Sequence, residues 1–189
     1  GSVRLALLRI IFKSAGLPEQ YPHARFVLWL RHEGIYDQVR SYIDQNGCDW
    51  DEELDNLYVA EGLHNALVQA KPNLFPSPES CVETLNNLYP YVQDISSDDM
   101  IKAIRQALTR GGKFPLTLVV LDEVQQYIGE DSQRSIDVQE AVEACCKNIG
   151  SKLLFIGTGQ TAVSGTSNLK KLEGRFTIRV ELSDADVDT

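Results

Sequence analysis

Two adjacent carboxylates, Asp122 and Glu123, directly follow the apolar run LTLVVL at residues 116–121. A short, continuous apolar run that is rich in β-branched residues is typical of a strand buried on both faces of a parallel sheet. In open α/β sheets, ligands bind beyond the carboxyl ends of the strands, where we expect these two acids to lie. The pair suits phosphoryl transfer, in which Asp122 would hold Mg²⁺ and Glu123 would polarise the attacking water.

A second apolar run, LLFI at residues 153–156, predicts the next strand, and it is followed by Gly157 and Thr158. Parallel strands end at the same edge of a sheet, so we expect the Thr158 side chain to reach the terminal phosphate of a nucleotide. Apolar residues followed by Asp-Glu form the Walker B pattern. In the alternative interpretation, Asp122 and Glu123 only cap the turn that follows their strand.

The rest of the chain predicts the elements that must position these residues. Residues 3–113 contain apolar stripes with helical spacing that end at Gly or Pro, which predicts a large helical region. Residues 114–189 alternate strand, helix, strand, short helix and strand, with the main helix at 136–148 and the last strand at 176–182. We therefore expect an α/β fold, with a partial parallel sheet at 114–189 and a helical N-terminal half inserted into or attached to it.

The order of these segments resembles the second half of an AAA+ type P-loop ATPase core. In that family a Walker B strand is followed by a sensor-1 strand and an arginine-finger segment. The resemblance implies that Asp122 and Glu123 form the Walker B site, with Asp122 as the metal ligand. It also implies that Thr158 or Gln160 serves as sensor 1, with Gln160 in contact with the nucleotide.

The arginine-finger position falls in the sequence KLEGRF at residues 171–176, on Arg175. In the family, this arginine projects into the nucleotide site of a neighbouring subunit and stabilises the charge of the transition state. The alternative for Arg175 is an ordinary surface ion pair with Glu173.

Three longer stretches of the sequence are similar to the large P-loop ATPase of BREX bacteriophage-exclusion systems. They are FVLWLRHEGIYDQV at 26–39, LDEVQQYIGEDSQRSIDVQEAVEAC at 121–145 and LLFIGTGQTAVSGTSNLKKLEGRFTIRVELSDADVD at 153–188. The resemblance implies a large, cytoplasmic bacterial protein that binds ATP and Mg²⁺ and restricts phage together with a methyltransferase. It also implies contacts with other BREX components and an assembly of several copies.

One element of that family is missing from the sequence. No GxxxxGK[ST] phosphate loop (Walker A) occurs, and Gly112-Lys113 lacks both the spacing and the hydroxyl residue that should follow. We therefore expect a fragment whose phosphate loop would lie upstream of Val3. Such a fragment should bind no nucleotide and should be inactive alone.

A rival hypothesis assigns the chain to protein interaction, with the helical half as a docking module of a defence complex and no nucleotide role. Exposed apolar side chains clustered at Phe26, Trp29, Leu30, Tyr36 and Tyr42 would favour docking, whereas their burial against the α/β half would make them ordinary core.

Composition excludes several other classes of protein. The net charge of −9 argues against direct binding of nucleic acid, which requires a concentrated basic surface. No apolar run is long enough to span a membrane, so we expect a soluble protein. Cys48, Cys81, Cys145 and Cys146 have no CxxC spacing, and we expect reduced cytoplasmic thiols with no zinc site. The acidic residues at 49–55 fit the first turn of a helix better than a calcium loop.

Overall fold

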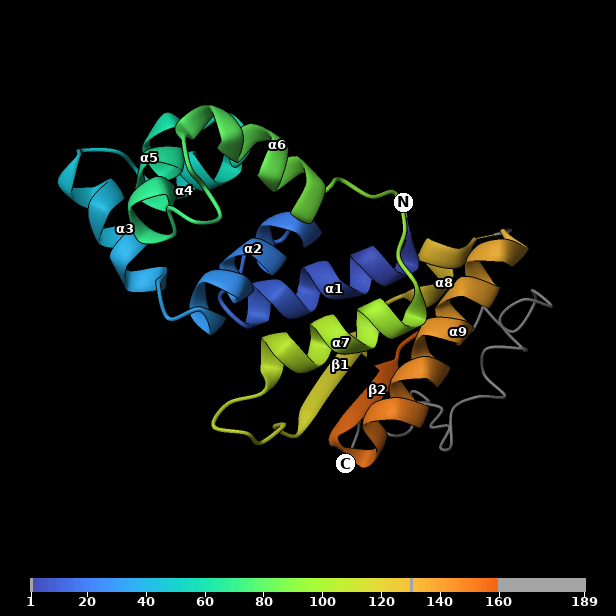
Figure 1. Ribbon diagram of the computed structural model, residues 1–189. Helices are drawn as coiled ribbons and strands as arrows, with labels where there is room; N and C mark the ends of the chain where they lie inside the picture. Colours follow the sequence, from blue (N-terminus) through green and yellow to red (C-terminus); the bar gives the residue numbers. More distant parts are fainter. Residues whose placement is uncertain (1, 130, 160–189) are drawn as a thin grey trace. The chain divides into compact units, whose positions relative to one another are not determined.

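The computed structural model describes residues 2–129 and 131–159, and it is mixed α/β and mostly helical (Figure 1). Packing divides the chain into two compact units, Gly1–Phe114 and Pro115–Thr189. The first unit is helical in its described part. The second contains a small parallel sheet, which consists of two strands in the described residues. No helix in the described ranges is long and apolar enough to cross a membrane.

The helices of the first unit begin and end at residues with clear local signals. They are α1 (Val3–Ser14), α2 (Tyr21–His32), α3 (Tyr36–Gln45), α4 (Trp50–Asp55), α5 (Glu61–Ala70), α6 (Pro78–Leu88) and α7 (Ser97–Leu108). At four helix starts, the side chain of the residue before the helix accepts a backbone N–H from the first turn. These capping residues are Ser2, Asp49, Ser77 and Ser96. Gly16, Gly34 and Gly47 follow the first three helices with φ between +66° and +73°, where a side chain would be strained.

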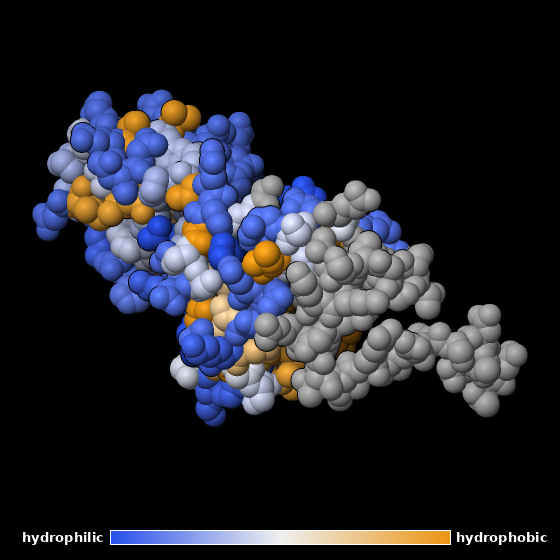
Figure 2. Space-filling model, turned by 90° about the vertical axis from the view of Figure 1, so that its right-hand side faces the viewer, coloured by the Kyte–Doolittle hydropathy of each residue, from blue (hydrophilic) through white to orange (hydrophobic). Residues whose placement is uncertain are grey.

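Aromatic and aliphatic side chains fill the core of the helical unit, and hydrophilic residues make up most of its surface in the view of Figure 2. Phe12, Phe26 and Phe75 are fully buried, and the edge of the Tyr89 ring meets Phe26 at 5.6 Å between centroids. Helix α1 packs against α2 and α7, and α3 packs against α5.

The residues that would have favoured docking belong largely to this core. Phe26 and Leu30 are completely buried, while Trp29, Tyr36 and Tyr42 are half-buried. A docking role therefore gains no support from this group of side chains.

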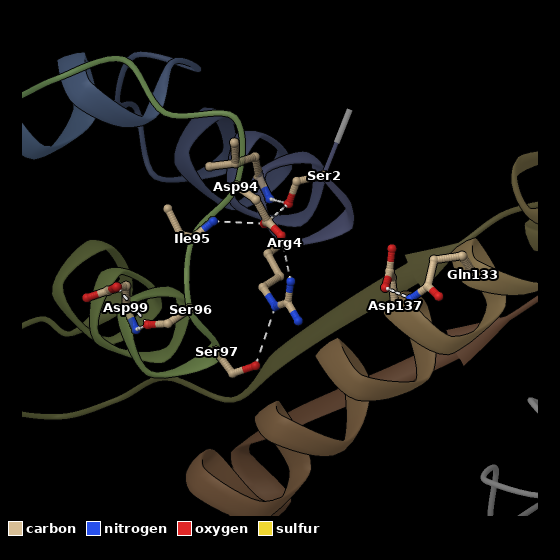
Figure 3. Close-up of polar contacts among 10 residues, drawn as sticks. Ser2, Arg4, Asp94, Ile95, Ser96, Ser97, Asp99, Gln133 and Asp137 are labelled. Atoms are coloured by element: carbon tan, nitrogen blue, oxygen red, sulfur yellow. Dashed lines mark hydrogen bonds and ion pairs between the residues drawn. The ribbon is translucent and has the colours of Figure 1, made fainter.

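Polar contacts join the start of α1 to the segment that leads into α7 (Figure 3). The Arg4 guanidinium donates to the Asp94 carboxylate at 2.8 Å and to the Ser97 hydroxyl at 3.4 Å. The Ser96 hydroxyl accepts the Asp99 N–H at 3.1 Å and donates to the Asp99 carboxylate at 2.7 Å. These bonds hold the beginning of α7, and α7 packs on α1.

In its described part, residues 115–129 and 131–159, the second unit consists of two strands and the helices between them. Its elements are β1 (Thr117–Leu121), α8 (Val124–Ile128), α9 (Ser132–Ile149), the short 3₁₀ helix η1 (Gly150–Lys152) and β2 (Leu153–Gly157). The strands are parallel and in register, from Thr117 opposite Leu153 to Leu121 opposite Gly157. Helix α9 starts earlier than predicted because the Asp131 carboxylate accepts the N–H groups of Gln133 and Arg134.

The expectation that both faces of the sheet are buried is wrong for the described residues. Val119 and Leu153 are buried, and α9 packs against β2. The alternate residues Leu118, Val120, Leu154 and Ile156 are 46–55% exposed and share the opposite face. The physical reason is that the described part of this unit supplies a helical layer for one face only. The predicted helix at 168–172 and strand at 176–182 lie outside the described residues.

His23 introduces a titratable group into the core of the helical unit. The side chain is buried, its Nε2 lies 3.4 Å from the Tyr91 hydroxyl, and its ring contacts Tyr58 and Tyr91. Burial lowers the pKa of His23 below its ordinary value of 6.5, although the Asp55 carboxylate opposes this shift.

We predict that the helical unit loses stability as the pH falls below about 6.5, because the unfolded chain then binds a proton that the folded His23 resists. Above that pH both states hold neutral histidine and this contribution is fully present. Denaturant unfolding at pH 7.5 and 5.5, followed by the fluorescence of Trp29 and Trp50, measures the difference. Replacing His23 by Gln should reduce the difference, whereas His32→Gln, at an exposed position, should leave it unchanged. An equal pH dependence in all three proteins would contradict the prediction.

Candidate functional site

The site forms where β1 and β2 end at the same edge of the sheet. Beyond the last strand residues, the Thr158 N–H donates to the Leu121 carbonyl at 2.9 Å. The Val124 N–H, at the start of α8, donates to the Thr158 carbonyl at 3.2 Å. Thr158 is therefore held through both its N–H and its carbonyl against the chain that leaves β1.

The Thr158 hydroxyl connects both acids of the predicted pair. It donates to the Asp122 carboxylate, and it accepts the backbone N–H of Glu123 at 3.0 Å. The structure thus brings Asp122, Glu123 and Thr158 together, although Thr158 lies 36 positions after Asp122 in the sequence. We call these three residues the carboxylate–hydroxyl junction.

Glu123 has an unusual backbone conformation at this junction. Its φ of +46° is the only positive φ of a non-glycine residue within the described ranges. The left-handed region costs a non-glycine residue on the order of 1 kcal/mol, and such residues cluster at functional sites. The N–H bond to Thr158 compensates part of this cost.

Gln126 is a further contributor to the site, and sequence reasoning did not identify it. Its side-chain amide donates to the Glu123 carboxylate, and its backbone N–H donates to the Glu123 carbonyl at 2.8 Å. The separation of three residues is the only signal in the sequence that could have suggested the contact, because side chains at i and i+3 meet within a helical turn.

The Asp122 carboxylate behaves differently from a helix cap. Its hydrogen bond comes from Thr158, at the end of the neighbouring strand, and no backbone N–H of α8 donates to it within the described part. This geometry speaks against the alternative interpretation for Asp122. Glu123 contacts its own turn through Gln126, so a local structural role remains open for its side chain.

The oxygen atoms of the junction suit a magnesium ion that is shared with a substrate. Asp122 and Thr158 are exposed, whereas Glu123 is half-buried. Among the described residues, no group of three His, Cys, Asp or Glu side chains could hold a metal ion on its own. Mg²⁺ commonly takes one or two carboxylates and completes its shell with phosphate oxygens and water, so Asp122 fits this kind of binding. Gln160 and Arg175, the other two predicted site residues, lie outside the described ranges.

Comparison with known proteins assigns no family. No protein-family model matches the chain, and no solved structure matches it. Functional assignment therefore depends on the junction and on the sequence patterns around it.

We predict that Thr158→Val exposes the Glu123 amide to solvent exchange, because valine has nearly the same shape but cannot accept its N–H. Loss of one hydrogen bond of about 1 kcal/mol should accelerate exchange at Glu123 about fivefold. Amide exchange measured by NMR on the 189-residue chain provides the test. Thr158→Ser, which keeps the hydroxyl, is the matched control, and the Thr158 amide itself should keep its protection in both variants. Unchanged exchange at Glu123 in Thr158→Val would disprove the assigned bond.

Proposed function

We propose that residues 115–189 form the Walker B half of an ATP-hydrolysing P-loop site in a phage-defence ATPase of the BREX type. The observation that carries the proposal is the carboxylate–hydroxyl junction at the carboxyl ends of two parallel strands. Ligands of open α/β sheets bind at this edge. The BREX assignment is supported by the stretches at 121–145 and 153–188 quoted above, and it extends to cytoplasmic action with other BREX components.

In this proposal the Asp122 carboxylate would hold Mg²⁺. When bound, the ion supplies positive charge that neutralises the phosphate oxygens during transfer. The hydrogen bond from Thr158 orients the Asp122 carboxylate toward the edge of the sheet. Asp122 is exposed there, so it can approach a bound nucleotide.

Glu123 acts as the base that orients and deprotonates the attacking water. Its carboxylate is held by the Gln126 amide, and its strained backbone is held by Thr158. A base fixed in this way needs little reorganisation in the transition state, which is how positioning lowers a barrier. Thr158 therefore positions both acids, and as the sensor-1 residue it would face the terminal phosphate of a bound nucleotide.

Completion of the site requires parts that the described residues do not provide. Gln160 would contact the nucleotide, and Arg175 would act on the nucleotide of a neighbouring copy in an oligomer. The backbone nest and lysine of a GxxxxGK[ST] loop would bind the phosphates, and the 189 residues contain no such loop. Hydrolysis is accordingly a property of the complete ATPase in this proposal.

We predict that Glu123→Gln in the complete ATPase preserves nucleotide binding but reduces hydrolysis on the order of a hundredfold or more, because the amide keeps the shape of the side chain and cannot accept a proton. Binding is measured with a fluorescent ATP analogue and turnover by phosphate release. Glu140→Gln on α9 is the control for loss of one charge in the same unit, and it should retain normal turnover. Wild-type turnover in Glu123→Gln would contradict the catalytic role and would support the alternative in which Glu123 only stabilises the turn after β1.

We also predict that the 189-residue chain shows no saturable binding of Mg-ATP in the micromolar range, because a lone carboxylate pair cannot replace the phosphate loop. Isothermal titration calorimetry provides the measurement. Saturable micromolar binding that is lost in Asp122→Asn would overturn the need for a separate phosphate loop while it supported the site itself.

A further inference from the structure

The exposed face of the two-stranded sheet carries a continuous block of aliphatic side chains. The register places Leu118 opposite Leu154 and Val120 opposite Ile156, and each of these four side chains is 46–55% exposed. Leu116, just before β1, is 76% exposed. Soluble proteins rarely leave a large block of neighbouring apolar side chains open, because burying it is favourable. The face therefore has the character of an interface.

The two ends of this sheet carry opposite charges. At the carboxyl end, Asp122 is exposed, and Thr158 donates to its Oδ1 atom, so its Oδ2 atom can accept from a further donor. At the amino end, Lys152 is exposed and directly precedes β2. Since each strand has five residues, these two ends lie about 17 Å apart. The apolar block is thus flanked by a carboxylate at one end and an ammonium group at the other.

We propose that this face is an interface between two copies of the chain, which pack sheet against sheet with their strands antiparallel. In a two-fold arrangement each copy presents the same surface, so aliphatic side chains meet aliphatic side chains. The carboxyl end of one sheet then lies over the amino end of the other. Asp122 of each copy faces Lys152 of the other copy, and the symmetry produces two such charge pairs.

Charge complementarity favours a second copy as the occupant and also selects the orientation. With parallel strands, two Asp122 carboxylates would meet at one end and two Lys152 ammonium groups at the other, which is repulsive. A segment of another protein would have to supply matching charges, whereas this face already matches itself. An element that covers the face in a larger assembly would compete with the second copy. The interface does not depend on the proposed nucleotide role.

The size of the face predicts a weak dimer. Five aliphatic side chains, four of them about half exposed, supply less surface than the ~800 Å² per partner that stable complexes bury. We therefore expect a dissociation constant on the order of tens of micromolar. Sedimentation equilibrium of the 189-residue chain measures this constant, at about 0.15 M salt to screen the repulsion between net charges of −9.

Charge reversal and mixing test the assigned orientation. Asp122→Lys and Lys152→Asp should each weaken self-association about tenfold, because each places like charges together across the two-fold axis. An equimolar mixture of the two variants should restore the dimer, because every pair then has opposite charges. Mixing could not restore association if either substitution had merely damaged the fold. Lys147→Asp on α9, which changes the net charge as Lys152→Asp does, is the matched control and should leave the dimer unchanged.

A double variant, Val120→Thr with Ile156→Thr, tests the apolar contact. Threonine keeps the β-branched shape that strands favour but places a hydroxyl in the interface, so the dissociation constant should rise about tenfold. Circular dichroism verifies that this variant is folded.

Three results would overturn the proposal. The first is a chain that stays monomeric at concentrations well above the expected dissociation constant. The second is a dimer that neither the threonine variant nor the charge reversals weaken, which would place the interface elsewhere. The third is a mixture of the two charge-reversed variants that associates no better than either variant alone.

Discussion

The in-register parallel pairing of β1 with β2 is the constraint on which the candidate site depends. It places Leu121 opposite Gly157, so that the next residues along the two strands meet at the same edge. The bond from the Thr158 N–H to the Leu121 carbonyl extends the pairing by one step. A slip of one residue would turn every strand side chain to the other face and would carry the Thr158 hydroxyl away from Asp122. The chemistry available at this edge is therefore determined by register before any side chain is considered.

Given that register, one hydroxyl group satisfies two different needs. The chain turns sharply after Asp122, and Glu123 adopts a left-handed conformation to make this turn. Glycine would relieve the strain but would remove the carboxylate. Thr158 accepts the N–H of the strained residue and donates to the adjacent carboxylate, so the same bond pair stabilises the turn and orients the acid. The turn and the proposed chemistry therefore depend on the same hydroxyl group, which serine at position 158 would keep and valine would remove.

Sequence patterns predicted the strands closely because continuous apolar runs leave few alternatives. The expected strands at 116–121 and 153–156 correspond to Thr117–Leu121 and Leu153–Gly157. The placement of Asp122 and Thr158 at one edge of the sheet was predicted from the ends of the two strands, whereas the hydrogen bond between their side chains was not predicted. The positive φ of Glu123 and its contact with Gln126 could not be predicted, because both depend on the exact path of the turn. The burial of both sheet faces was predicted wrongly, since a run of residues such as LTLVVL specifies apolar faces but not the layer that covers them.

The exposed apolar face of the sheet indicates what kind of element would cover it. Leu118, Val120, Leu154 and Ile156 form an apolar surface of the kind that parallel sheets cover with helices. A covering helix that runs antiparallel to the strands, as helices of βαβ units do, would begin at the edge where the strands end. Its N-terminus would then present unpaired N–H groups and a partial positive charge beside Asp122 and Thr158, where a phosphate could bind. If the proposed nucleotide role holds, a single helical layer would bury the face that the described residues leave exposed and would also supply anion-binding groups beside the carboxylates, so one element would complete both the core and the proposed site.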